Sequence, residues 1–103
     1  MNKSKRLEFH SILVSLLGSS NVYFQPPSTI KMNYPCIVYQ RNNVSKNNAD
    51  DLLYTYSQGY TVTVIDPNPD SHIPEKVLKL PFSSYQRNFT SDNLNHDVFD
   101  VYY

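Results

Sequence analysis

The chain has 103 residues, enough for one domain whose single core buries roughly 60–70% of the extended chain's surface. Nine basic residues balance nine acidic ones, and this zero formal charge argues against a generally basic nucleic-acid binder. Cys36 is the single cysteine, which excludes an intrachain disulfide and a cysteine-based zinc cluster. The longest apolar run, near residues 12–17, is far shorter than the ~20 residues of a membrane span, and no signal-peptide pattern precedes it, so we expect a soluble cytosolic protein.

An amphipathic helix is predicted over residues 4–17, ahead of Gly18, because glycine commonly ends helices. Its apolar residues recur at helical spacing and form one stripe: Phe9, Ile12, Leu13 and Leu16. We expect this stripe to cover one face of a sheet. A short strand follows at residues 21–25 and ends at the Pro26-Pro27 pair.

A second strand is predicted over residues 36–41, directly after Pro35. Its alternation gives two faces: Cys36, Val38 and Gln40 on one, Ile37 and Tyr39 on the other. Residues 42–51 contain four asparagines and one apolar residue larger than alanine, so we expect a polar, mobile loop. The next strand begins early, within residues 52–56, and either continues to residue 65 or breaks near Gly59.

The clearest pattern lies between residues 60 and 80, where the side-chain period changes from that of a strand to that of a helix. The strand over residues 60–65 has two β-branched or aromatic faces: Tyr60, Val62 and Val64 on one, Thr61, Thr63 and Ile65 on the other. Pro67 and Pro69 then interrupt the ladder. A second helix is predicted over residues 71–80, with these features: Asp70 or Ser71 as N-cap, Pro74 in the first turn, and an apolar face of Ile73, Val77 and Leu80.

Pro81 ends that helix, and an extended segment follows at residues 85–89. Residues 90–93 are predicted to form a connecting turn before a last strand over residues 95–103. That strand alternates between two faces: Asp97, Phe99, Val101 and Tyr103 against His96, Val98, Asp100 and Tyr102. The order of elements predicts a single α+β domain over residues 1–103, with a mainly antiparallel sheet of about four to five strands and both helices on one face.

One group of ionisable residues is the best candidate for catalysis or metal binding: His96, Asp97, Asp100 and Asp92 near the last hairpin, with His72 and Asp66 at the other turn. In a strand, however, His96 and Asp97 point to opposite faces, and no motif supplies a nucleophile or metal partner. Turn hydrogen bonds by Asp92 and a polar role for His96 are the simpler interpretation. We expect Cys36 to be a buried, inert thiol. The sequence thus predicts no catalytic residue, no cofactor and no metal site.

Aromatic composition is the other unusual property, with nine tyrosines, five phenylalanines and no tryptophan. Tyrosine is common at protein interfaces, but it also suits strands, and both explanations stay open. Several segments together resemble, in order and over nearly the whole chain, the tail terminators of long-tailed bacteriophages, also called tail completion proteins. They are the first helix ending in Leu-Leu-Gly, followed by residues 21–27, 34–39, 60–66 with Pro69-Asp70, and 92–97.

This resemblance implies an α+β subunit of a hexameric ring that caps the finished tail tube and helps to join the head. The implied partners are further copies of the chain, the tail tube protein and head-tail connector proteins, with no membrane and with DNA only as the passing genome. The implied location is the virion tail, after assembly in the host cytoplasm. The family brings no catalytic residues, and the alternatives are another head-tail connector or neck protein, or a small enzyme or regulator using His96 and the nearby aspartates.

A ring subunit needs polar loops that become ordered on assembly and exposed aromatic anchors. We therefore expect the loop at residues 42–51, with the tyrosines that follow it, to lie at a subunit or tube interface. The predicted interface residues are Asn43, Ser45, Asn47, Asn48, Asp50, Tyr54 and Tyr56.

Overall fold

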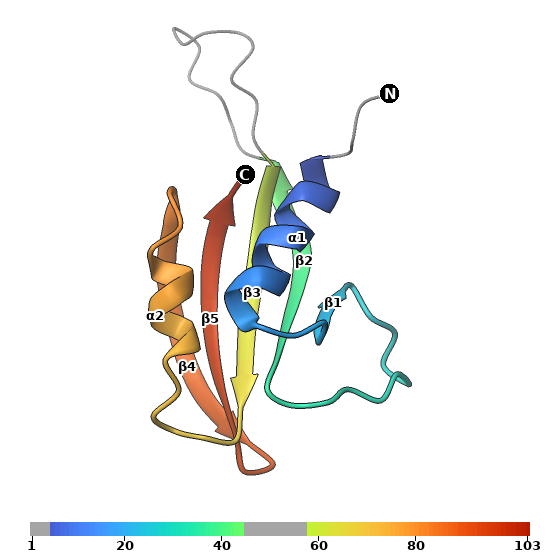
Figure 1. The fold of residues 1–103 in the computed structure, drawn as a ribbon, viewed down its shortest axis with the longest axis vertical. Coiled ribbons are helices and arrows are strands. Elements are labelled where there is room, and N and C mark those ends of the chain that lie inside the picture. The colour runs from blue at the N-terminus through green and yellow to red at the C-terminus, as the bar shows by residue number, and fades with distance from the viewer. Residues whose placement is uncertain (1–4, 45–57) are drawn as a thin grey trace, which may run out of the picture.

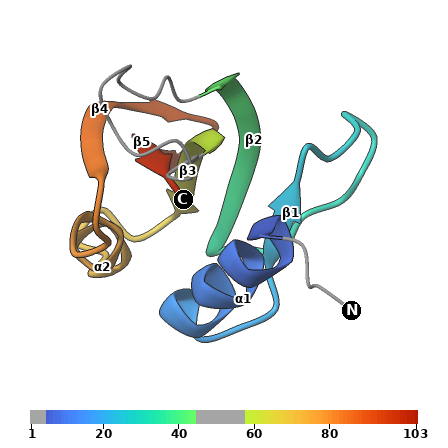
Figure 2. The same ribbon diagram turned by 90° about the horizontal axis from the view of Figure 1, so that it is seen from above.

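The computed structural model describes residues 5–44 and 58–103 of the chain. Its elements, in chain order, are α1 (Lys5–Leu17), β1 (Val22–Phe24), β2 (Cys36–Val44), β3 (Gln58–Asp66), α2 (Ile73–Leu78), β4 (Ser83–Ser91) and β5 (Leu94–Tyr102). The strands form one sheet in the order β1-β2-β3-β5-β4, in which β1 pairs with β2 in parallel and the other pairs are antiparallel. Both helices lie on the same side of this sheet (Figure 1, Figure 2). The predicted α+β fold with a mainly antiparallel sheet is confirmed.

Helix α1 packs on the core with three of the four residues of the predicted stripe. Ile12, the fourth, is partly exposed and not part of this core, whereas Val14 and Leu17 also pack against it. Phe9 and Leu13 are fully buried, and Leu16 packs against the same core from the predicted stripe. Gly18 ends the helix in the left-handed conformation, with φ of 85°, and its N–H donates to Val14 O at 2.9 Å. The helix therefore ends at the predicted residue, Leu17. The predicted first residue, residue 4, lies outside the described residues.

The predicted alternation of β2, β3 and β5 is confirmed, because buried apolar side chains on each strand share the face that carries the helices. They form the main core together with α1 and α2: Phe9, Leu13, Val22, Ile37, Tyr39, Tyr60, Val62, Val64, Val77, Phe99 and Val101. The opposite face buries fewer side chains, namely Cys36, Ile65 and Val98, and leaves Thr61 and Thr63 partly accessible. The main core thus lies between the sheet and the helices. Within the described residues, the other face of the sheet has no helix and few buried side chains, and we call it the thin face.

Strand β2 is longer than predicted. The prediction ended it at residue 41, but the strand continues to Val44, which pairs with Gln58 of β3 after a register shift. The side chain of Asn42 explains part of this difference, because its Nδ2 donates to Thr61 Oγ1 at 3.1 Å across the strand pair. β3 also runs through Gly59, which is paired with Tyr102. The remainder of the predicted loop and the early strand start at residues 52–56 lie outside the described residues.

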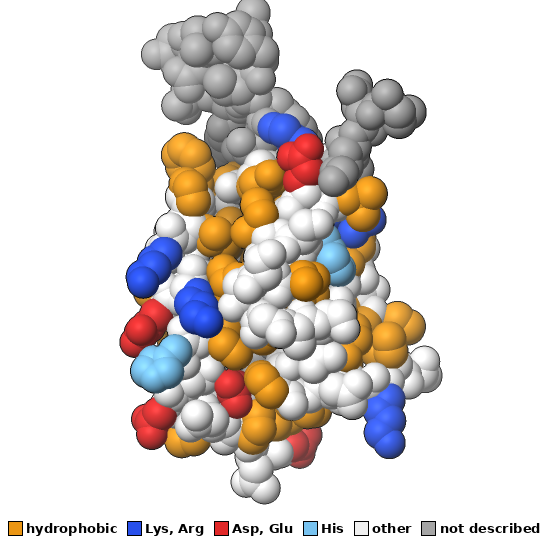
Figure 3. Space-filling view, in the orientation of Figure 1, with side chains coloured by type: hydrophobic (Ala, Val, Ile, Leu, Met, Phe, Trp, Pro, Cys, Tyr) orange, Lys and Arg blue, Asp and Glu red, His pale blue; other side chains and the backbone are white. Residues whose placement is uncertain are grey.

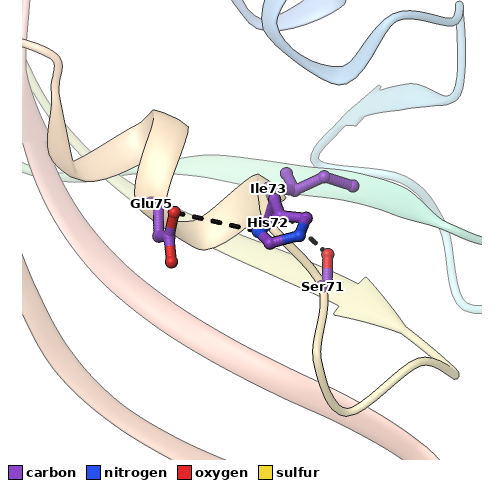
Figure 4. Close-up of polar contacts among 4 residues, drawn as sticks. All are labelled: Ser71, His72, Ile73 and Glu75. Atoms are coloured by element: carbon purple, nitrogen blue, oxygen red, sulfur yellow. Dashed lines mark hydrogen bonds and ion pairs between the residues drawn. The ribbon is translucent and has the colours of Figure 1, made fainter.

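Helix α2 is shorter than predicted, with six residues instead of ten positions from 71 to 80, and its N-cap prediction was wrong. The N-cap is His72, whose side chain makes no capping bond, while Ser71 Oγ accepts the Ile73 N–H at 3.2 Å (Figure 4). Asp70 belongs to the preceding turn, where its N–H donates to Asn68 Oδ1 at 2.9 Å. Such local side-chain to backbone bonds compete with helix capping.

The apolar face of this second helix is nevertheless as predicted. Val77 is fully buried, and Ile73 and Leu80 pack against the core. The chain tightens after Leu78, because the N–H groups of Lys79 and Leu80 bond carbonyls three residues earlier at 3.2 and 3.0 Å. Leu80 therefore reaches the core from a turn rather than from the helix.

The β4–β5 hairpin has a tighter turn than the predicted residues 90–93. Asp92 and Asn93, with φ of 54° and 62°, form a two-residue connection of the primed type that suits the strand twist. Thr90 and Ser91 belong to the ladder and pair with residues of β5. The register of β4 shifts between Tyr85 and Arg87, so that strand carries one extra residue, a β-bulge.

Candidate functional site

The predicted catalytic group does not come together in the structure. The ring of His96 stacks on Phe89 on the helix-free face, with centroids 4.5 Å apart and an interplanar angle of 13°. Asp97 points to the helix-covered face, where its Oδ1 accepts the Tyr85 hydroxyl at 2.9 Å. Asp100 accepts a hydrogen bond from the Gln86 amide. Across residues 5–44 and 58–103, no group of three His, Cys, Asp or Glu residues is placed to hold a metal ion.

The ionisable residues of the other turn have structural partners. Asp66 is 8% exposed, and its Oδ1 accepts the Asn68 N–H at 2.8 Å. His72 Nδ1 lies 3.9 Å from Glu75 Oε1, but both side chains are largely exposed (Figure 4). An exposed pair of this kind contributes little. Asp92 occupies the hairpin turn at positive φ.

Cys36 is fully buried at the start of β2, as predicted. Burial raises the pKa of its thiol to about 11. The thiol is therefore protonated at neutral pH, whereas a nucleophile or metal ligand would need the thiolate. Its position fits a packing role on the thin face of the sheet.

The predicted interface residues lie mostly outside the described part of the chain. Of the seven, only Asn43 falls within a described element, as a backbone position near the end of β2. The other six lie within residues 45–57, so their role in an interface stays a prediction. The tyrosines elsewhere divide between the two explanations, since Tyr39 and Tyr60 are buried in the core while Tyr34, Tyr85 and Tyr102 are about 40% exposed.

A different surface is the best candidate site, and it lies at the β4 edge of the sheet. Four of the eight large, exposed hydrophobic side chains of the described residues occur there, and we call them the β4 edge cluster: Leu78, Phe82, Tyr85 and Phe89, with exposed fractions of 48%, 79%, 42% and 42%. Eight of the nine residues of β4 are exposed. Within the described chain β4 pairs with β5 alone, so its outer backbone groups lack a strand partner. Such an edge favours contact with another chain.

Phe82 combines two unfavourable features at one position of this cluster. Its side chain is 79% exposed, and its backbone has φ of 60°, a conformation that is rare for a bulky residue. The strand pairing holds it there, because Phe82 O accepts the Tyr102 N–H at 3.1 Å. Strain that coincides with exposure is typical of a site used for recognition.

An apolar groove adjoins Phe82 on the helix side of the sheet. It has a volume of about 310 Å³ and is lined by Phe9 and Ile12 of α1, residues 80–82, and residues 101–103. In the space-filling view, hydrophobic side chains reach the surface in a strip between the two helices (Figure 3). The lining carries no charged side chain, so the groove suits an apolar or aromatic group of a partner rather than an ionic ligand.

The exposure of Phe82 and Leu78 was not predicted from the sequence. The available signal was their position: Leu78 lies off the apolar stripe of the second helix, and Phe82 follows the proline that ends that helix pattern. An apolar residue that neither a helix stripe nor a strand alternation accounts for is a candidate for the surface. The exposure of both residues could therefore have been predicted from the sequence, although the backbone strain at Phe82 could not.

Comparisons of the chain with protein-family models, with curated proteins and with solved structures found no match. No helix of the described chain has the length and apolar character needed to cross a membrane. The geometry offers a contact surface formed by an open strand edge, exposed aromatic side chains and an apolar groove.

Proposed function

We propose that the chain is a structural subunit of a bacteriophage tail, of the tail-terminator kind. Copies of the subunit form a ring, hexameric as in the family that the sequence resembles, which caps the tail tube, ends its polymerisation and contributes to head-tail joining. The family resemblance supports the phage assignment. It is carried by the first helix and by the segments between residues 21 and 97, which follow one another in the same order as in the family. The structure contributes independent support for an assembly role.

The β4 edge cluster is the observation that carries this proposal. A ring subunit must present an apolar surface that binds a neighbouring copy and closes the ring. Exposed hydrophobic patches on a small domain mark such contacts. Phe82, Tyr85 and Phe89 place three aromatic rings along the β4 edge, with Tyr85 on its helix-covered face and Phe89 on its helix-free face. A neighbouring subunit that binds this edge would contact both faces, and aromatic anchors contribute strongly to interfaces. The zero net charge of the chain also leaves little long-range repulsion between copies.

The experiment combines the full chain with tail tubes assembled from the tube protein of the same phage. We expect rings at tube ends in electron micrographs, a ring-sized oligomeric mass, and tubes that stop growing at a defined length. A chain that stays strictly monomeric alongside tail tubes would rule out the ring. Binding to head-side connector proteins without binding to tubes would replace the terminator assignment with the connector alternative.

Two variants test whether the β4 edge cluster forms the contact. Phe82→Ser and Phe89→Ser should each abolish ring formation, because both remove an exposed aromatic ring and leave the core unchanged. Leu7→Ser is the matched control, since Leu7 is 46% exposed but lies on α1, away from β4. Thermal unfolding of all three variants must match the wild type for the comparison to be valid. Rings that form equally well from all three would place the contact elsewhere.

A further inference from the structure

The hydroxyl of Tyr39 lies beneath α1 and has two polar partners on that helix. Tyr39 is fully buried, and its ring contacts Phe9 at a centroid distance of 5.5 Å and Phe24 at 4.9 Å. Its oxygen lies 2.7 Å from His10 Nδ1 and 3.2 Å from Arg6 Nη1. This three-residue network therefore joins one face of α1 to strand β2 inside an otherwise aromatic contact.

Chemistry fixes the direction of the Arg6 hydrogen bond, and the tautomer of His10 sets the direction of the other. Arg6 can only donate, so the Tyr39 oxygen accepts from it. We assign to His10 the neutral tautomer with its proton on Nε2, because Nδ1 then accepts the Tyr39 hydroxyl proton and the hydroxyl both donates and accepts. Burial raises the pKa of Tyr39, so its hydroxyl keeps this proton at neutral pH. In this tautomer, the Tyr39 hydroxyl has both a donor and an acceptor as partners while His10 is neutral.

Protonation of His10 would break this arrangement. Nδ1 would become a donor, the Tyr39 hydroxyl proton would lose its acceptor in a buried position, and two cations would converge on one oxygen. Arg6 of α1 is the positive charge that acts on His10, and the neutral Tyr39 of β2 is its hydrogen-bond partner. Phe24 of β1 packs on the other two members of the network, with its ring centroid 4.4 Å from the Arg6 guanidinium. Glu8 is held on another side of α1 by Tyr103.

We infer that His10 and Tyr39 form an acid-sensitive latch, which holds α1 on the sheet when His10 is neutral and weakens that contact when His10 is protonated. Release would uncover an aromatic floor, because Phe9 of α1 stacks on Tyr60 and Tyr103 with centroids 4.8 and 5.3 Å away. The latch is a property of the fold and does not depend on the proposed tail function.

The direction of the pH effect follows from the titration of His10. Burial, with Arg6 as the second cause, lowers the pKa of His10 below its ordinary value of 6.5. The folded state thus binds this proton less readily than the unfolded state. The stabilisation is complete above about pH 6.5 and is lost as the pH falls through the lower folded-state value.

The test uses the full chain, with hydrogen exchange of α1 and β5 amides compared at about pH 7.5 and about pH 5, corrected for intrinsic exchange. We expect protection in α1 to fall several-fold more than protection in β5. His10→Gln cannot take up the proton and should lose this difference, whereas His72→Gln, the matched change of an exposed histidine, should keep it. Tyr39→Phe retains the aromatic contacts and removes the shared oxygen, so it should reduce the difference and leave the part that burial and Arg6 cause.

A direct titration in the wild type keeps the inference testable if the core variants fold poorly. Ring signals of His10 in nuclear magnetic resonance spectra should titrate below the ordinary histidine range, together with shifts in neighbouring α1 amides. A His10 titration at or above 6.5, or equal acid loss of α1 protection in His10→Gln and wild type, would overturn the latch.

Discussion

The hydroxyl of Tyr103 donates a hydrogen bond of 3.1 Å to Glu8 Oε1, although the two residues lie 95 positions apart in the sequence. The same tyrosine stacks on Phe9 with ring centroids 5.3 Å apart. One side chain after β5 thus contacts α1 in two different ways, through an exposed polar bond and through a partly buried ring. The two contributions can be separated by mutation.

Removing the hydroxyl and removing the whole ring of Tyr103 should have unequal effects. Tyr103→Phe deletes an exposed hydrogen bond and should lower the free energy of unfolding by about 0.5 kcal/mol or less. Tyr103→Ala also removes the stacked ring and should cost about 1.5–3 kcal/mol. Urea unfolding followed by circular dichroism measures both. Equal losses would mean that the polar bond, not the ring, joins Tyr103 to the helix.

The thiol of Cys36 should be unreactive in the folded protein. It is fully buried, and burial raises its pKa to about 11, so both access and thiolate are lacking near pH 8. A thiol reagent should react at the rate of unfolding in buffer and at once in denaturant. Reaction in buffer that is as fast as in denaturant would show that the thin face of the sheet opens readily.

The side-chain pattern predicted most of the sheet because periodicity is a local property. Alternation in the segments around Tyr39, Val62 and Phe99 indicated which residues face the helices, and all three are fully buried. The continuation of β2 to Val44 could not be predicted, because it depends on pairing with Gln58 of a strand distant in sequence. Polar residues such as Asn42 join a strand when a neighbour supplies hydrogen bonds.

The candidate surface was harder to predict than the fold. The sequence showed many aromatic residues but could not divide them between core and surface, since Tyr39 and Tyr85 have the same chemistry and opposite exposure. The predicted N-cap of α2 was wrong for a related reason. Ser71 bonds Ile73, but Asn68 and Asp66 draw the preceding backbone into turns that fix where the helix begins.

Gly18 should be costly to replace although it has free space around it. A Cβ added there would meet nothing within 4 Å, but the residue has φ of 85°. Gly18→Ala should therefore lower the free energy of unfolding by about 1–2 kcal/mol, from backbone strain alone. The control is Ser20→Ala, an exposed position in the same turn. Calorimetric unfolding of both variants distinguishes strain from a general sensitivity of this turn.

The hairpin turn offers the opposite case, in which a glycine should stabilise the protein. Asn93 has φ of 62° at the second central position of a two-residue turn, where glycine is preferred. Asn93→Gly should change the free energy of unfolding by less than about 1 kcal/mol, towards greater stability, whereas Asn93→Val should cost about 1–2 kcal/mol because a β-branched residue resists positive φ. Thermal unfolding of the two variants beside the wild type provides the measurement. If valine were tolerated as well as glycine, the positive φ at this position would not control the β4–β5 register.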